Sequence, residues 1–244
     1  MTKIERIKFQ MKKRIALSAS ITFLVLFLIF TVLVITVDVQ PIGPNGSKVG
    51  LATMNGAVAD AIGYNGTWYT ISEYVGYIPL AIAGAFALLG LFQAIQRKSF
   101  AKVDRYLYIL ASFYVLLLSV YFLFEVLAIN YRPVLIDGEL EASFPSSHTL
   151  LSLSITASAI FEFHTLIKDR KALLIVSDAI CIISGGIVLV GRLLSGVHWL
   201  SDIIAGILIS GALVCFFIFG MFLAKDIENR KKNSQSSKET TVND

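Results

Sequence analysis

The chain has 244 residues, of which 56% are hydrophobic and 16% are charged, with a formal net charge of +4 and a mean hydropathy of +0.74. This composition excludes a disordered chain, and so few charges could not cover an ordinary soluble domain, in which roughly 25% of residues are charged. The two cysteines, Cys181 and Cys215, both lie in apolar runs, so neither a disulfide framework nor a Cys-rich metal site is expected. The composition therefore predicts a polytopic, single-domain membrane protein.

Six stretches are apolar and long enough to cross a bilayer, which takes about 20 helical residues. The first follows a basic start, but its apolar core is longer than that of a signal peptide and no small-residue cleavage site follows it, so we expect a retained span. We predict an all-α membrane protein with an N-terminal segment 1–14, a membrane domain 15–223 and a disordered polar tail 224–244. The predicted spans are Ile15–Val37, Tyr74–Ile95, Tyr106–Ile129, Leu150–Ile167, Ala172–Gly191 and Ile203–Leu223.

The basic residues are divided unevenly between the two sides of these spans. Of the 21 Lys and Arg, 18 lie in the two terminal segments, the second–third loop or the fourth–fifth loop, and the other side holds Lys48, Arg132 and Arg192. The positive-inside rule then predicts that both termini are cytoplasmic. The basic clusters need no role beyond topology and contacts with anionic membrane lipids. Nucleic-acid binding is not expected, because the clusters are split among short segments next to the membrane.

A long external loop, 38–73, joins the first two spans. Turn residues mark Pro41 to Gly46. The segment Asn55–Thr70 is predicted to form a short helix in the membrane interface, anchored by Trp68 and Tyr69.

Three polar segments are predicted to meet on the external face. They end the third span, begin the fourth span and form the turn between the fifth and sixth spans. The predicted helix start at Pro145-Ser146-Ser147-His148 offers a serine cap and free N–H groups, which together make an anion site.

The chemistry of these segments suits phosphate transfer. The guanidinium groups of Arg132 and Arg192 match the geometry of phosphate oxygens. His198 and Asp202 are four residues apart and are therefore expected on one helix face, where the carboxylate would orient the imidazole. One histidine could then attack phosphorus while the other, His148, protonates the leaving oxygen, without a metal.

Each segment also has an ordinary structural explanation. An Arg-Pro after a span can be a snorkelling residue and a helix stop, Pro-Ser-Ser a helix start, and His-x-x-x-Asp a surface pair, so none of them alone indicates a function. Their convergence on one face, with two of the three histidines of the chain, favours a functional site. A zinc site made by His148, His198 and Asp202 is an alternative, but the two arginines would repel the cation.

In order and spacing, these residues resemble the type 2 phosphatidic acid phosphatase (PAP2) superfamily over about residues 70–223. The family signature is Lys-x6-Arg-Pro, Pro-Ser-Gly-His and Ser-Arg-x5-His-x3-Asp. The chain matches it with Arg132-Pro133, with Pro145-Ser146-Ser147-His148, and with Arg192-x5-His198-x3-Asp202. It departs in three places: Glu125 for Lys, Ser147 for Gly and Gly191 for Ser.

The resemblance implies a role for each matching residue. It implies that His198 is the nucleophile that forms a phospho-histidine, that Asp202 orients it and that His148 protonates the leaving group. It also implies that the phosphoryl oxygens are bound by Arg132, Arg192 and Ser146, with the backbone near Ser147. The family implies no cofactor and no metal.

Glu125 is the departure with the largest expected consequence. It stands seven residues before Arg132, about two turns on an uninterrupted helix, so we expect it to pair with Arg132 or Arg192, or else to bind a head-group hydroxyl. A carboxylate that snorkels to external water is the equally weighted alternative. If Glu125 is adapted to the site, Glu125→Lys should lower kcat/KM by roughly tenfold or more.

The remaining acidic residues are expected to be structural. For Asp178, inside the fifth span, a hydrogen-bonded packing role is favoured over a functional one, and Glu162 and His164 need no role. Asp137, Glu139 and Glu141 are expected to form a solvated external loop.

The sequence predicts a lipid phosphatase of a bacterial plasma membrane with an outward-facing site. Undecaprenyl diphosphate is the first candidate substrate, and phosphatidylglycerophosphate or phosphatidate is the alternative. Two other classes are alternatives: a non-catalytic protein that binds or moves lipid phosphates, suggested by Glu125, and a vanadate-dependent oxidase, disfavoured by membrane burial.

Overall fold

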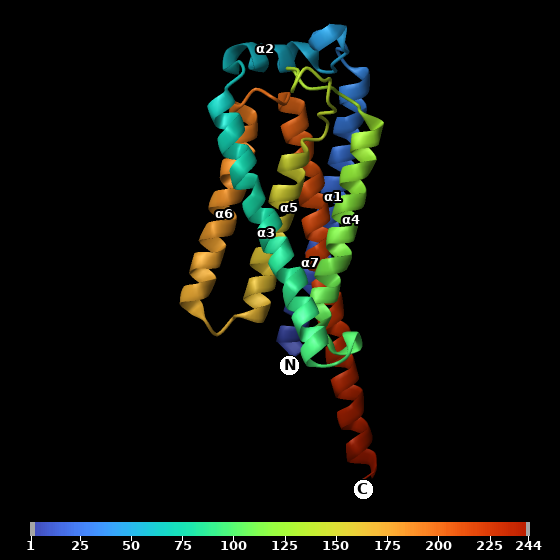
Figure 1. The fold of residues 1–244 in the computed structure, drawn as a ribbon. Coiled ribbons are helices and arrows are strands. Elements are labelled where there is room, and N and C mark those ends of the chain that lie inside the picture. Colours follow the sequence, from blue (N-terminus) through green and yellow to red (C-terminus); the bar gives the residue numbers. More distant parts are fainter. Residues whose placement is uncertain (1–2, 243–244) are drawn as a thin grey trace.

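The computed structural model describes residues 3–242, the last twelve by their backbone alone, and within this range it is a bundle of long helices (Figure 1). Six described helices are long and apolar enough to cross a membrane, which confirms the predicted all-α, six-span architecture. The shorter α2 lies across one end of the bundle. The helices are α1 Lys3–Thr36, α2 Ala52–Ile62, α3 Gly66–Gln96, α4 Arg105–Leu127, α5 Ser147–Leu166, α6 Lys171–Leu194 and α7 Leu200–Val242, with 3₁₀ turns at Pro44–Gly46 and Phe100–Lys102.

The short helix predicted over Asn55–Thr70 is present only in its first part, as α2, because the chain breaks between α2 and α3. Gly63 has a φ of 65°, which ends α2, and the side chain of Asn65 accepts a hydrogen bond from the Trp68 N–H at 3.1 Å. This N-cap starts α3 at Gly66 rather than near Tyr74. Trp68 and Tyr69 consequently lie in the first turn of a spanning helix.

The terminal segments also differ from the prediction. α1 already begins at Lys3, and α7 continues to Val242 where a disordered tail was expected. No Gly or Pro follows Gly220 to break the helix. Asp226 of α7 also contacts α1, accepting hydrogen bonds from Lys13 at 2.8 Å and Gln10 at 3.0 Å. The division of the chain at residues 14 and 223 remains a prediction.

The core lies where α5 and α7 pass through the bundle. α1 packs along α7, and α5 contacts α3, α4, α6 and α7. Phe144, just before α5, packs between Phe27 of α1 and Phe124 of α4, with both ring centroids 6.3 Å away. This packing fixes the segment that leads into α5.

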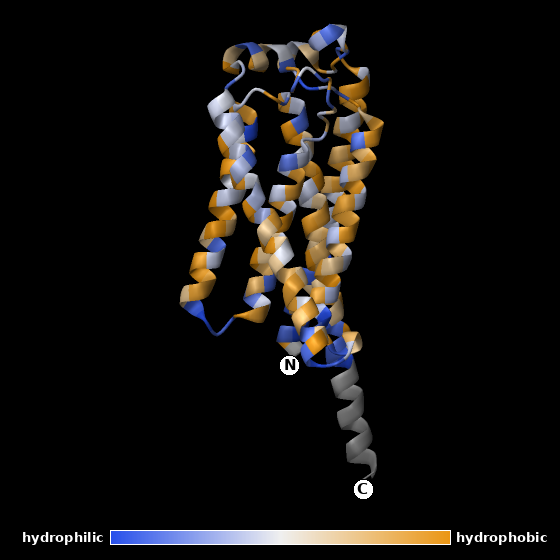
Figure 2. Cartoon of the chain, in the orientation of Figure 1, coloured by the Kyte–Doolittle hydropathy of each residue, from blue (hydrophilic) through white to orange (hydrophobic). Residues whose placement is uncertain are grey.

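Polar residues collect at the two ends of the bundle, with hydrophobic residues between them (Figure 2). The loops that follow α3 and α5 lie at the same end as the N-terminal part of α1. The hydrogen bond predicted for Asp178 is present, because His164 Nε2 lies 2.8 Å from Asp178 Oδ2 and joins α5 to α6. His164, for which no role was expected, is thus part of the packing of these helices.

Glu162 of α5 provides a test of stability. Glu162 is fully buried, and neither of its carboxyl oxygens has a hydrogen-bond partner. Since burying an unpaired polar group costs about 1–3 kcal/mol, we expect Glu162→Met to raise the Tm of the purified protein in detergent by several degrees. The exposed-loop variant Glu139→Met is the control and should leave Tm unchanged. A lower Tm in Glu162→Met would show that the carboxyl group has a stabilising partner.

Candidate active site

The start of α5 presents the Pro-Ser-Ser-His segment. Ser146 is the N-cap residue, and its buried Oγ accepts hydrogen bonds from the Thr149 N–H at 3.5 Å and the Thr149 hydroxyl at 3.1 Å. Ser147 is the first helical residue and is absent from the residues with positive φ. A serine in place of the family glycine is therefore compatible with the backbone here.

Asp202 connects three segments at the start of α7. Its carboxylate accepts hydrogen bonds from the Trp199 N–H at 3.0 Å and from the Asn130 side chain at 3.3 Å, while its backbone carbonyl accepts one from the Ser146 N–H at 3.0 Å. Asp202 is the third residue of α7, and Trp199 is the residue that precedes the helix. Their hydrogen bond is therefore one half of a capping box. Asp202 is therefore held in place before any substrate is considered.

His198 lies in the turn between α6 and α7, two residues before α7 begins. The prediction that His198 and Asp202 share a helix face is therefore wrong, although the two side chains do meet, with His198 Nδ1 3.6 Å from Asp202 Oδ2. His198 is 4% exposed. Burial lowers the pKa of its imidazole well below the ordinary value, and the positive charges of Arg132 and Arg192 lower it further. The ring is consequently neutral at pH 7.

Arg192 is fully buried at the end of α6. Its Nη2 donates to Glu73 Oε2 of α3, and its guanidinium carbon lies 5.3 Å from the ring centroid of Tyr69. Its Nε and Nη1 have no hydrogen-bond partner. The same Glu73 oxygen lies 3.2 Å from His148 Nε2. Glu73 thus holds an arginine and a histidine from two different predicted motifs.

Glu73 is not among the residues predicted from the sequence. The second span was predicted to start at Tyr74, which assigned Glu73 to the external loop. With α3 beginning at Gly66, Glu73 is inside a spanning helix, where an acidic residue is a functional candidate by default. The Asn65 cap is the signal that could have revealed it.

Arg132 has a different acidic partner. Its Nε lies 2.9 Å from Glu141 Oε2, and its backbone N–H donates to the Glu141 carbonyl at 3.0 Å. Arg132 is 8% exposed and its Nη1 has no hydrogen-bond partner. Glu141 therefore contacts the candidate site, whereas it was expected only in a solvated loop.

Glu125 forms an ion pair with neither arginine, contrary to the expected pairing. α4 ends at Leu127, and Ala128 adopts a left-handed conformation with a φ of 44°, so Arg132 does not continue the same helix. Glu125 instead lines a small pocket with Tyr121, Phe124 and the segment from Ala142 to Ser147. The effect of Glu125→Lys stays a prediction, without that pairing to support it.

Two glycines allow the helices around the site to approach closely. A Cβ at Gly191 would lie 2.8 Å from the Ser72 Cβ, so α6 passes against α3 just before Arg192. This contact explains why glycine stands where the family has serine. A Cβ at Gly76 would lie 3.5 Å from His148 Cδ2, one turn along α3 from Glu73.

The structure thus brings Arg132, Ser146, His148, Arg192, His198 and Asp202 to one end of the bundle and adds Glu73 and Glu141. Ser147 and Glu125 line the neighbouring small pocket. Among the described residues there is no group of three or more His, Cys, Asp and Glu side chains arranged to hold a metal.

The comparisons with known proteins agree with this geometry. Residues 127–226 match the PAP2 superfamily. The structure resembles the crystal structure of a transmembrane PAP2-type phosphatidylglycerolphosphate phosphatase from Bacillus subtilis, with a TM-score of 0.58 and 16% identity over 85% of this chain and 96% of that chain. No match was found among curated proteins.

These findings define a polytopic membrane protein whose motif-bearing part has the order and spacing of a phosphatase family. The resemblance stated from the motifs is confirmed over the part of the chain that carries them, because residues 127–226 match the PAP2 superfamily.

Proposed function

We propose that the chain is a metal-independent lipid phosphatase that works through a phospho-histidine on His198. One observation carries the proposal. Buried guanidinium nitrogens of Arg132 and Arg192 have no hydrogen-bond partner in the protein and stand beside two histidines. Because buried donors are normally satisfied, such a group of donors suits a ligand with several anionic oxygens, and a phosphoryl group provides them.

In the first step, His198 attacks phosphorus. Its Nδ1 faces Asp202, which leaves Nε2 for the new N–P bond. The P–O bond to the leaving group breaks, and the leaving oxygen takes a proton from His148. Asp202 stabilises the positive charge that develops on the His198 ring, and Arg132 and Arg192, together with the Ser146 hydroxyl and the backbone near Ser147, bind the phosphoryl oxygens.

In the second step, His148 accepts a proton from water, which attacks phosphorus and breaks the N–P bond. Inorganic phosphate leaves and His198 returns to its neutral form. Glu73 would hold His148 and Arg192 in position through both steps, since one of its oxygens contacts both side chains.

The proposed substrate is a lipid that carries a phosphate monoester or a diphosphate. Its tail would stay in the bilayer while its head reaches the ends of α5 and α6. Undecaprenyl diphosphate remains the first candidate. Phosphatidylglycerophosphate is the second, favoured by the activity named for the Bacillus subtilis protein, and phosphatidate is the third.

The most informative test measures phosphate release by the purified protein from these three lipids, with and without EDTA. Turnover of at least one lipid that is unaffected by EDTA is expected. Binding of all three without turnover would favour the non-catalytic alternative. Inhibition by EDTA, reversed by added Zn²⁺, would favour the metal-site alternative.

We also propose that the site faces outward from a bacterial plasma membrane, which the placement of 18 of the 21 basic residues on the other side supports. In a background with Cys181 and Cys215 replaced by alanine, Glu139→Cys is expected to react with an impermeant thiol reagent on intact cells. Lys102→Cys, at the other end of the bundle, is the control and should react only after lysis. The reverse pattern would invert the topology.

The depressed pKa of His198 predicts the pH dependence of the reaction. A nucleophilic imidazole must be neutral, and burial lowers the pKa of His198. The ordinary pKa of histidine is about 6.5. The reaction rate, so far as it depends on neutral His198, should therefore be maintained as pH falls through this value and decline only at lower pH.

The measurement is a kcat/KM profile, which reports groups of the free enzyme. Arg132→Gln removes one of the positive charges that lower the pKa of His198 and should move the acid limb to higher pH. An acid limb that stays in place in Arg132→Gln would contradict this account.

A further inference from the structure

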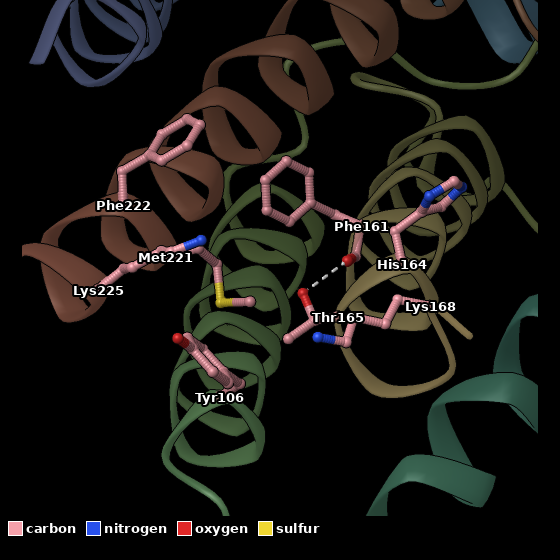
Figure 3. A pocket seen from close by; sticks show the side chains of 8 residues that line it. All are labelled: Tyr106, Phe161, His164, Thr165, Lys168, Met221, Phe222 and Lys225. Atoms are coloured by element: carbon pink, nitrogen blue, oxygen red, sulfur yellow. Dashed lines mark hydrogen bonds between the residues drawn. The ribbon is translucent and has the colours of Figure 1, made fainter. Parts of the chain in front are cut away.

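A second cavity lies at the basic end of the bundle, far along the helices from the candidate active site. Its volume is about 440 Å³. Its walls come from the start of α4, the end of α5 with Lys168 two residues beyond it, and α7 (Figure 3). The lining residues are Tyr106, Phe161, His164, Thr165, Lys168, Met221, Phe222 and Lys225.

The cavity combines two cationic groups with an apolar wall. Lys168 and Lys225 are exposed, come from opposite walls and form no ion pair with a described residue. The nearby acid of α7, Asp226, is instead paired with Lys13 and Arg230. Both lysine ammonium groups are therefore available to an anion at the mouth of the cavity.

The apolar side of the cavity is formed by large side chains. Phe161 and Phe222 pack edge to face with ring centroids 6.1 Å apart, and Met221 is 3% exposed beside them. His164 contributes less to anion binding, because its Nε2 is engaged by Asp178 at 2.8 Å. The cavity thus presents charge at the end of the helices and hydrocarbon toward the middle of the bundle.

We propose that this cavity is a binding site for the phosphodiester head group of an anionic phospholipid in the leaflet opposite the active site. The position of the lysines at the ends of spanning helices matches the depth of lipid phosphates. The aromatic and methionine side chains would pack on the glycerol and the first methylene groups of the acyl chains. The proposal does not depend on the proposed catalytic function.

The test uses dioleoylphosphatidylglycerol and native mass spectrometry of the purified protein in detergent. The measured quantity is the apparent Kd for the first dioleoylphosphatidylglycerol molecule that binds. The variant Lys168→Ala/Lys225→Ala is expected to bind it at least fivefold more weakly than the unchanged protein. The matched control Lys102→Ala/Lys171→Ala removes the same charge from two exposed residues at the same end, outside the cavity, and should change the apparent Kd less than twofold.

Two further arms separate the alternatives. Dioleoylphosphatidylcholine, which has no net charge, should bind the unchanged protein more weakly than the anionic lipid. Excess orthovanadate, a phosphate analogue directed at the active site, should not displace the bound phosphatidylglycerol.

If lipid binding is weakened equally in both double variants, the effect comes from overall surface charge, and the proposal is overturned. If orthovanadate displaces the lipid, the lipid is bound at the active-site end of the bundle, and the proposal is also overturned. If alanine lowers the Tm of the cavity variant, Lys168→Gln/Lys225→Gln keeps a polar side chain only one atom shorter, without the charge, and should reproduce the weaker binding.

Discussion

His198→Ala is expected to lower kcat/KM for the best lipid substrate by at least about a thousandfold, the scale found when a covalent nucleophile is removed. The change deletes the nitrogen atom that would bond to phosphorus. The measurement is inorganic phosphate release at matched protein concentration. The lipid should still bind, because Arg132 and Arg192 remain.

Two companion measurements make this prediction specific. Asp202→Asn should leave more activity than His198→Ala, since it keeps the hydrogen bond from the Trp199 N–H but loses the negative charge. After acid-free quenching, a ³²P-labelled substrate should label the unchanged protein and leave His198→Ala unlabelled. If His198→Ala is still labelled, another residue is the nucleophile.

Arg192→Lys is expected to lower kcat/KM by about a hundredfold, although it keeps the positive charge. The guanidinium of Arg192 is fully buried, donates to Glu73, lies over the Tyr69 ring and has two further nitrogens without partners. A lysine ammonium cannot hold Glu73 and present a planar pair of donors to phosphate at the same time. The control is Lys48→Arg, at an exposed basic residue outside the candidate site, which should leave kcat/KM unchanged.

A double-mutant cycle identifies the cause of that loss. Because Glu73 contacts Arg192 and His148 through one oxygen, Glu73→Gln and Arg192→Lys should be non-additive. Strict additivity, or full activity in Arg192→Lys, would show that the site needs only a positive charge at position 192. The Tm of each variant separates loss of folding from loss of chemistry.

Much of the fold was predictable because hydrophobic length is a local property. Each of the six spans is an apolar run in the sequence, and all six were found, with ends that differ where capping decides. The start of α3 at Gly66 depends on the Asn65 side chain, and the end of α4 depends on the left-handed Ala128. A helix end that depends on one residue is a weak signal in a sequence. Because these two ends were not predicted, Glu73 and Glu125 lie in environments that differ from those expected.

The candidate site was predicted in part for a similar reason. Arg132, His148, Arg192, His198 and Asp202 stand at spacings that can be compared with a family, so they could be named without coordinates. The partners of these residues could not, because Glu73 and Glu141 contact the arginines from other parts of the chain at no characteristic spacing. The buried Asn55 of α2, which bonds to Ser201 at the start of α7, was missed for the same reason.

The sequence by itself determined the class of protein, the number of spans and which residues are candidates for phosphate chemistry. These follow from hydrophobic length and from motif spacing, which the chain carries locally. Tertiary structure alone decided which basic side chain each carboxylate contacts. Glu73 contacts Arg192 and His148, Glu141 contacts Arg132, and Glu125 forms an ion pair with neither arginine. The physical reason is that an ion pair requires two groups within a few ångströms, and packing between helices far apart in the sequence sets that distance.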